Sequence, residues 1–208
     1  MKFILSAKNL TKSYTQTRGF FARQSTTIRA LDDVSIDIQS GKTIAVVGES
    51  GSGKSTLAKA LIKLISIDVG TIFFDGQDIS DLEGDKLKKI RKKIQMIFQD
   101  PYASLNPRMR IADILEEPLL INKFDDIVRR KKINNIIQKV GLNIEDLTKY
   151  PHQFSGGQRQ RIGIARALIL EPKLVICDEP VSALDVSVQA QILELLKSLQ
   201  KEFKLTYL

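Results

Sequence analysis

Residues 48–56 carry the clearest chemical pattern in the chain. They read Gly-Glu-Ser-Gly-Ser-Gly-Lys-Ser-Thr and match G-x-x-x-x-G-K-[S/T], the P-loop pattern. Gly48, Gly51 and Gly53 lack a Cβ, so the backbone can curl and direct several N–H groups toward one anion. Lys54 would reach the β- and γ-phosphates of a nucleotide. The segment therefore predicts a nucleotide-phosphate site.

The other hydroxyl side chains of this segment complete the predicted site. Ser55 would supply its hydroxyl to Mg²⁺, and Thr56 would add a further phosphate contact. Ser50 and Ser52 lie between the glycines and belong to the same predicted binding set. The alternative is a glycine-rich turn that binds nothing, and the strand and helix expected on either side of the segment argue against it.

A second glycine-containing segment, Ser155-Gly156-Gly157-Gln158, precedes an apolar helical stripe. A serine at the N-cap followed by two glycines leaves backbone N–H groups free to face an anion. This segment has no lysine. It predicts a second phosphate-binding helix start, and an ordinary capped helix is the alternative.

Two adjacent carboxylates and one amide follow predicted buried strands. Asp178 and Glu179 come directly after the apolar run 174–177, and Gln99 follows the run 94–98. We expect Asp178 to anchor the Mg²⁺ shell and Glu179 to take a proton from the attacking water. Gln99 is placed to touch the metal ion or the water, because ligands gather at the carboxyl ends of parallel strands. Without the surrounding motifs, Gln99 would be interpreted as a plain surface residue.

The elements around the P-loop have simple patterns. Residues 43–47 form an unbroken apolar run rich in β-branched residues, which predicts a strand buried on both faces. After the P-loop, apolar residues recur with helical spacing. These are Leu57, Leu61, Leu64 and Ile65. The predicted order is strand, glycine loop and helix.

Residues 3–14 and 28–38 are predicted as strands of an antiparallel sheet, because they alternate apolar and polar residues. Residues 15–27 between them are mostly polar and are predicted as a loop. Tyr14 at the edge of this loop could stack on an adenine ring or cover the sheet edge as a core aromatic. These two roles are equally supported by the residue alone.

Further along, residues 71–74 and the pair Asp75-Gly76 predict a strand leading into a hairpin, followed by a basic helix that ends near Lys93. The region 102–150 contains helical patterns broken by prolines, including Glu117-Pro118, and has no strand signal. It is expected to form a helical insertion in a parallel-sheet core.

Composition limits the class of protein. The chain has 208 residues and a formal net charge of +8, which suits one domain that favours anionic partners. The single cysteine, Cys177, excludes an intrachain disulfide and fits a reducing compartment. No stretch is apolar for long enough to span a bilayer or to form a signal-peptide core. The basic runs 86–93 and 129–132 are expected to be solvated helix faces.

These motifs together resemble those of ATP-binding-cassette ATPases, the motor subunits of ABC transporters. The P-loop, Gln99, the signature 154–158, the strand ending in Asp178-Glu179 and the segment 182–185 occur in that family's order. The resemblance covers essentially the whole chain. It implies an α/β fold with a P-loop NTPase core and a mainly parallel sheet, an N-terminal antiparallel β subdomain and an inserted α-helical subdomain. Residues 1–208 would be one domain, with 1–99 and 154–208 as the ATP-binding core and 100–153 as the helical subdomain.

The resemblance also implies a mode of action with ATP and Mg²⁺. Two cassettes would form a head-to-tail homo- or heterodimer, in which the P-loop of one and Ser155-Gly156-Gly157-Gln158 of the other clamp each ATP. Tyr14 would stack on adenine, and Asp185 would belong to the nucleotide-binding set. The helical insertion would grip a membrane permease at the cytoplasmic face, and an extracytoplasmic solute-binding protein would act indirectly.

Within the family, the segments 98–109 and 150–154 resemble the ATP-binding subunits of oligopeptide and dipeptide importers. Importers of nickel and glutathione share much of this pattern and remain alternatives. A soluble cassette ATPase acting on nucleic acid has only the net charge in its favour, and a P-loop kinase would give no role to Ser155 through Gln158.

Two features depart from the family pattern. Phe154 stands where leucine is usual, a common exchange in the peptide-importer branch. The family also places a switch histidine after the strand that residues 205–208 begin, whereas the only histidine in this sequence is His152. We therefore expect a fragment that binds Mg–ATP, hydrolyses it weakly and dimerises poorly.

Overall fold

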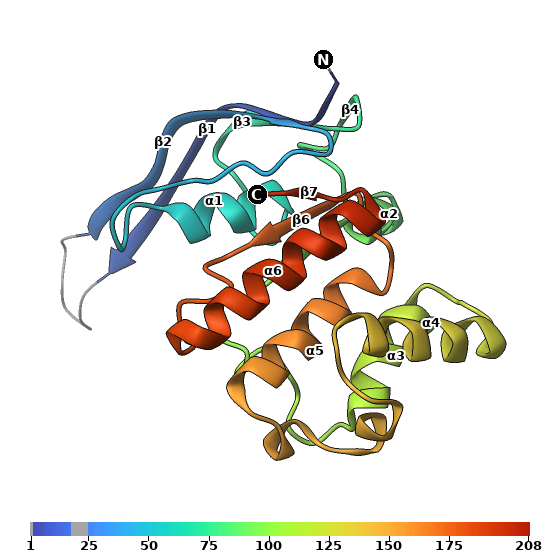
Figure 1. Cartoon of the computed structure of the whole chain (residues 1–208). Coiled ribbons are helices and arrows are strands. Elements are labelled where there is room, and N and C mark those ends of the chain that lie inside the picture. Colours follow the sequence, from blue (N-terminus) through green and yellow to red (C-terminus); the bar gives the residue numbers. More distant parts are fainter. Residues whose placement is uncertain (1, 18–24) are drawn as a thin grey trace. The chain divides into compact units, whose positions relative to one another are not determined.

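The computed structural model describes residues 2–17 and 25–208 (Figure 1). It divides into two compact units, one made of Met1–Arg91 with Leu208 and the other of Lys92–Tyr207. The described strands form one antiparallel and one parallel sheet, as the sequence predicts.

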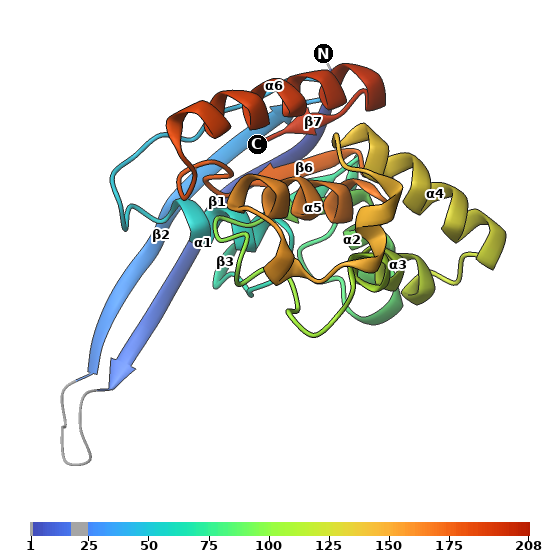
Figure 2. The same ribbon diagram turned by 60° about the horizontal axis from the view of Figure 1, so that its bottom comes forward.

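The first unit is built on an antiparallel sheet with the strand order β2-β1-β3-β4 among the described residues. β1 (Phe3–Thr17) and β2 (Ser25–Gln39) form a long ribbon that Figure 2 shows extending from the rest of the sheet. The predicted strands are confirmed, but both are longer than expected. The predicted loop 15–27 contributes Thr15–Thr17 and Ser25–Thr27 to this ladder because β-branched threonines favour extended backbone, and residues 18–24 lie outside the described part.

The predicted hairpin after residue 74 is confirmed. β3 (Val69–Phe74) pairs with β4 (Gln77–Asp78) across a turn in which Asp75 has φ 50° and Gly76 has φ 81°. Positive φ at both central residues matches the right-handed twist of the strands, which explains the Asp-Gly pair.

The apolar run 43–47 does not form the predicted buried strand. Only Thr43 makes a β-bridge, and Val47 is 91% exposed. A β-branched run becomes a strand only when a neighbouring strand supplies ladder partners. Beyond the bridge at Thr43, none of these residues is assigned to a strand in the described chain.

The helix after the P-loop, α1 (Lys54–Leu61), is confirmed but short. It buries Leu57 and Leu61, whereas Leu64 and Ile65 follow the helix end, and Leu64 is exposed. The basic helix α2 (Gly84–Lys93) ends where the sequence predicts and buries Ile90.

The second unit contains the parallel sheet, with the order β5-β6-β7 among the described strands. These are β5 (Ile94–Ile97), β6 (Leu174–Cys177) and β7 (Thr206–Tyr207). β6 pairs with both neighbours in parallel, and its first three residues are fully buried. The helices α5 (Gly156–Leu168) and α6 (Val186–Phe203) contribute to the same core, and the predicted apolar face of α5 is buried.

The helical insertion is confirmed as the region between β5 and α5. It contains α3 (Ile111–Ile121), α4 (Asp126–Lys139) and two 3₁₀ helices, η1 (Ile144–Thr148) and η2 (Pro151–Gln153). Figure 2 shows α3, α4 and α5 gathered beside one another. The sequence predicts a helix break at Pro118. In the structure Pro118 lies inside α3, and Leu115 and Leu119 on either side of it are fully buried. Packing of this apolar face outweighs the hydrogen bond that proline cannot donate.

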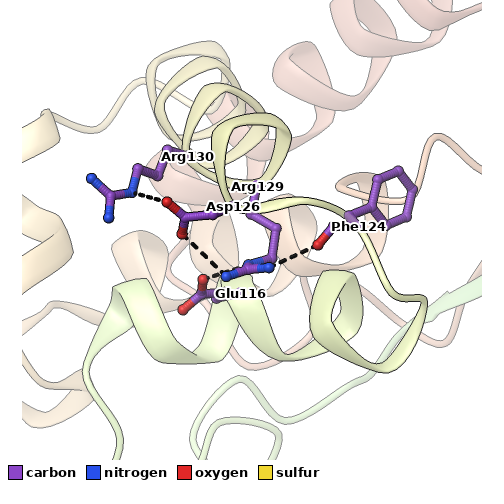
Figure 3. Close-up of polar contacts among 5 residues, drawn as sticks. All are labelled: Glu116, Phe124, Asp126, Arg129 and Arg130. Atoms are coloured by element: carbon purple, nitrogen blue, oxygen red, sulfur yellow. Dashed lines mark hydrogen bonds and ion pairs between the residues drawn. The ribbon is translucent and has the colours of Figure 1, made fainter.

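Arg129 fixes the corner between α3 and α4 (Figure 3). Its guanidinium pairs with Glu116 of α3 at 2.7 Å and with Asp126 of α4 at 3.1 Å, and it donates to the carbonyl oxygen of Phe124 in the connecting turn at 2.7 Å. Arg130 pairs with the other oxygen of Asp126. This part of the basic run 129–132 is therefore an ion-pair network rather than a purely solvated face.

No helix in the described parts of the chain is both long and apolar enough to cross a membrane.

Candidate functional site

In the first unit, the P-loop backbone has the curled form that the sequence predicts. Gly51 and Gly53 have φ values of 82° and 92°, in the left-handed region that favours glycine. Gly53 is the N-cap of α1, and a Cβ at this position would overlap the carbonyl oxygen of Ala30 on β2. The glycine at 53 is therefore required both by its backbone conformation and by the strand beside it.

Lys54, Ser55 and Thr56 of the P-loop form the first turn of α1. Lys54 donates to the carbonyl oxygens of Gly48 and Glu49, both at 2.8 Å, so its ammonium group lies over the loop. Ser55 and Thr56 follow in the first turn and are half-buried, while Ser50 and Ser52 are more exposed. A cationic group and the positive end of a helix dipole thus face the same place, which suits a phosphate.

Tyr14 lies on β1 of the same unit and is 42% exposed. Its ladder partner on β2 is Ile28, and directly paired residues of antiparallel strands project from the same face. Lys12 places its ammonium group 5.7 Å from the ring centroid of Tyr14. The ring is accessible for stacking, and the adenine contact stays a prediction.

In the second unit, the structure brings Gln99 and Glu179 together. Ile97 of β5 pairs with Cys177 of β6, so both side chains follow strands that end side by side. The amide nitrogen of Gln99 donates to Oε2 of Glu179 at 2.8 Å. Asp178 follows β6 directly, and its N–H donates to the carbonyl oxygen of Ile97 at 3.0 Å. The contact brings together two residues that the sequence places after separate strands, while their roles toward a metal ion or water stay predictions.

Ser155 is the N-cap of α5, as predicted. Its hydroxyl accepts from the N–H of Gln158 at 3.3 Å, and the side chain of Gln158 accepts from the N–H of Ser155 at 3.0 Å. This capping box satisfies two of the free donors at the helix start. A Cβ at Gly157 would press on Val188 of α6, which explains the second glycine of the segment by close packing.

Asp185 is the N-cap of α6 and is exposed in the turn that follows Glu179. The sequence reasoning did not foresee two polar contacts nearby. Ser182 places its hydroxyl 3.5 Å from the amide nitrogen of Gln99, and buried Gln160 of α5 donates to the carbonyl oxygen of Pro180 at 2.7 Å. A glutamine inside the apolar face of a predicted helix was the available signal for the second contact.

The residues predicted for Mg²⁺ offer hard oxygen ligands: a hydroxyl from Ser55, an amide oxygen from Gln99 and a carboxylate from Asp178. Among residues 2–17 and 25–208, no three His, Cys, Asp or Glu side chains cluster as a protein-only metal site would require. Magnesium is usually held by one or two carboxylates together with phosphates and water, and a single carboxylate with neutral oxygen donors suits that chemistry.

Cys177 at the end of β6 is a partly buried thiol that packs against the core of the second unit. Desolvation raises its pKa to about 12, so the thiolate is scarce at neutral pH.

Comparison with known proteins gives consistent results. The profile of the ABC transporter family matches residues 31–182. The chain is 49% identical over its whole length to the di/tripeptide transport ATP-binding protein DppF of Pseudomonas aeruginosa, covering 64% of that protein. It is 55% identical over 87% of its length to the oligopeptide transport ATP-binding protein OppF of Streptococcus mutans, covering 59% of that protein.

A third relative, the dipeptide transport ATP-binding protein DppF of Escherichia coli, is 51% identical over 98% of the chain, which covers 61% of that protein. The chain therefore spans about three fifths of the length of these relatives.

Solved structures agree with this result. A dimeric post-hydrolysis state of the ATP-binding cassette MJ0796 bound to ADP and Pi has a TM-score of 0.82 at 33% identity, over 98% of this chain and 85% of that one. The cbiO1 cassette of Clostridium perfringens also has a TM-score of 0.82, at 29% identity, over 100% of this chain and 77% of that one. With its glycine loop, capped signature helix and paired Gln99 and Glu179, the chain belongs to the ABC transporter family of ATP-binding cassettes.

Proposed function

We propose that this chain binds Mg–ATP and that the protein to which it belongs hydrolyses ATP to drive import of oligopeptides or dipeptides through a membrane permease. The observation that carries this proposal is the contact between Gln99 and Glu179, which joins a polar amide to a carboxylate where two parallel strands end. The peptide transport named for the relatives supports the substrate class.

ATP binding begins with the P-loop. The N–H groups of Gly48 through Gly53 surround the phosphates, and Lys54 exchanges its carbonyl partners for the β- and γ-phosphate oxygens. Thr56 adds a phosphate contact. Tyr14, whose ring is exposed on β1, stacks on the adenine.

Ser55, Gln99 and Asp178 hold Mg²⁺ in this proposal, and the ion neutralises charge on the transferring phosphoryl group when it is bound. Glu179 acts as the general base that accepts a proton from the attacking water, and Gln99 orients that water. The hydrogen bond between Gln99 and Glu179 keeps both side chains at the place where the water must lie.

A second cassette completes each site. The amides of Ser155, Gly156 and Gly157, with Gln158 and Asp185, contact the ATP that is bound to the P-loop of the opposite protomer. The dimeric state of the relative MJ0796, which is bound to ADP and Pi, supports the pairing of two cassettes. The second cassette can be identical or different.

We further propose that residues 100–153 form the helical subdomain that contacts the permease at the cytoplasmic face of the membrane, with 1–99 and 154–208 as the ATP-binding core. A solute-binding protein outside the membrane delivers the peptide. The names of the relatives favour peptides over nickel or glutathione, and they favour a transporter over a nucleic-acid ATPase.

The test is reconstitution of the full-length protein with its permease in vesicles. We expect ATP-dependent uptake of a labelled dipeptide or tetrapeptide that is lost with Lys54→Ala. Uptake of Ni²⁺ or glutathione instead would contradict the substrate class. Salt-dependent DNA binding with no permease association would contradict the transporter function.

The 208-residue chain by itself is expected to bind Mg–ATP but to hydrolyse it slowly. His152, its only histidine, lies before the signature and stacks on Tyr150 with a centroid distance of 5.8 Å, so it does not match the switch histidine of the family. Steady-state hydrolysis by this chain at the rate of the full-length protein would contradict this expectation.

A further inference from the structure

Tyr102, three residues after Gln99, makes a contact that the proposed function does not use. Its ring lies under the guanidinium of Arg159 on α5, with 4.0 Å between the Arg159 Cζ atom and the ring centroid. Of the described cation–π contacts this is the shortest. Tyr102 is also 57% exposed, so its ring is not there to fill the core.

The other side of this contact is tied to the signature. Arg159 is the fourth residue of α5, and its N–H groups donate to the carbonyl oxygens of Pro151 at 2.8 Å and His152 at 3.3 Å. Both carbonyls belong to η2, which leads directly into Ser155. One guanidinium therefore holds the chain before the signature and stacks on Tyr102.

Tyr102 is itself fixed to Gln99 through a short connection. The carboxylate of Asp100 accepts from the N–H groups of Tyr102 at 2.7 Å and Ala103 at 3.2 Å, which closes a tight turn. Because this turn is hydrogen-bonded, we expect a displacement of Gln99 to move Tyr102 as well.

Tyr102 also touches the signature itself. A Cβ at Gly156 would lie 3.6 Å from the hydroxyl oxygen of Tyr102 and 3.3 Å from Leu184. The first signature glycine thus lies in a gap between these two side chains, inside the capping box that Ser155 and Gln158 form.

The rest of α5 is hydrogen-bonded to the loop that follows Gln99 and to the loop that follows Glu179. Gln160 donates to the carbonyl oxygen of Pro180, next to Glu179, and Arg166 donates to the carbonyl oxygen of Ser104 at 2.5 Å. These buried contacts hold the body of the helix. The stack between Tyr102 and Arg159 is the exposed contact at its N-terminal end, where the signature amides lie.

We propose that Tyr102 and Arg159 are positioning residues that keep the signature amides of Ser155–Gln158 aligned with Gln99, so that the two ATP sites to which one cassette contributes respond together. Neither residue touches the reacting atoms in this proposal. The inference rests on the proposed ATPase function, and it adds a specific pair through which the loop after Gln99 acts on the signature.

The test uses the full-length protein in its transporter complex. Tyr102→Leu keeps an apolar side chain but removes the stack, and Arg159→Lys keeps the charge but removes the planar group. We expect each to lower kcat for ATP hydrolysis by about 2- to 30-fold, the range that the energy of one cation–π contact implies. KM for ATP should stay within about twofold, because the P-loop contacts are unchanged.

Controls separate positioning from folding. Tyr102→Phe retains the ring and should keep kcat unchanged, while Lys197→Ala removes an exposed cation from α6, outside residues 100–153, and should have no effect. The double variant Tyr102→Leu with Arg159→Lys should lose no more than Arg159→Lys alone, since that variant already removes the stack on Tyr102.

A second measurement does not depend on hydrolysis. Hydrogen exchange of the amides at 155–158 should be faster in Tyr102→Leu than in the unchanged protein, whereas exchange in the P-loop should stay the same. Additive losses in the double variant, or unchanged exchange at 155–158, would overturn the inference. Absence of hydrolysis in the unchanged complex would instead contradict the proposed function itself.

Discussion

The side-chain amide of Gln99 donates to a carboxylate oxygen of Glu179 at 2.8 Å, although 80 residues separate them in the sequence. The parallel pairing of β5 with β6 explains this, because Ile97 and Cys177 are ladder partners and both side chains lie just beyond them. The arrangement puts a hydrogen-bond donor next to an exposed carboxylate, which suits a group that must hold and activate water.

Glu179→Gln should abolish ATP hydrolysis but leave the binding of Mg–ATP unchanged. Removing a general base typically costs about 10²- to 10⁴-fold in rate, while the glutamine still fits beside Gln99. The measurement is ATPase turnover of the reconstituted complex together with the affinity for Mg–ATP. Glu194→Gln, on the exposed face of α6, is the matched control and should leave both unchanged. Full turnover in Glu179→Gln would show that another group is the base.

Gly53→Ala should destabilise the fold and weaken nucleotide binding together. The new methyl group meets the carbonyl of Ala30, and φ of 92° is unfavourable for alanine. Gly41→Ala is the control: φ there is 75° with open space among the described residues, so its cost should be only the backbone term of about 1 kcal/mol. Chemical unfolding and ATP titration measure both effects. Equal losses in the two variants would mean that the close approach to Ala30 is unimportant.

Ser155→Ala should remove one half of the capping box. We expect a loss of about 1 kcal/mol in unfolding free energy, since an N-cap serine accepts from the N–H at N3. Binding of Mg–ATP by the P-loop should not change, but hydrolysis by the assembled protein should fall because the signature amides lose their alignment. Ser187→Ala, exposed in the first turn of α6, serves as the comparison. A drop in ATP affinity without loss of hydrolysis would contradict this assignment.

The sheet architecture could be predicted where the pattern is local. Alternation identified β1 and β2, the Asp-Gly pair identified the turn between β3 and β4, and the run 174–177 identified β6. In each case the residues themselves carry the preference, through pleated-surface packing or positive φ.

Two predictions were wrong because the structure there depends on contacts with other segments of the chain. The run 43–47 has the composition of a buried strand, but strand formation depends on partners that the local sequence does not contain. The sequence pattern predicts a helix break at Pro118, whereas burial of Leu115 and Leu119 keeps α3 continuous around it.

The candidate site also contains some features that the sequence predicts and others that it does not. The start of α1 after the P-loop and the cap at Ser155 are local motifs, and their backbone form could be predicted. The sequence places Gln99 and Glu179 each after a strand, but their contact depends on the pairing of β5 with β6, which the sequence does not show. The contacts of Ser182 and of Tyr102 with Arg159 depend on how loops pack on α5, which no spacing in the sequence shows.

Cys177 should resist modification in the folded protein. Its pKa is raised to about 12 by burial, so the thiolate that reacts with alkylating reagents is scarce at pH 8 and reacts fully only after unfolding. Because the folded state holds the proton more tightly, the stability that this thiol contributes is present below pH 9 and is lost as the pH rises toward 12. Comparison of unfolding free energies with Cys177→Ala across this range measures it. Rapid labelling of the native protein would contradict the burial.

The most direct measurement of the central claim is the mass in solution of full-length Glu179→Gln with and without Mg–ATP. If the P-loop of one protomer and Ser155–Gln158 of another bind the same nucleotide, this variant should form a dimer with Mg–ATP and remain a monomer with ADP. Adding Lys54→Ala should abolish the dimer. A monomer at saturating Mg–ATP, or a dimer that forms equally well without nucleotide, would contradict the account.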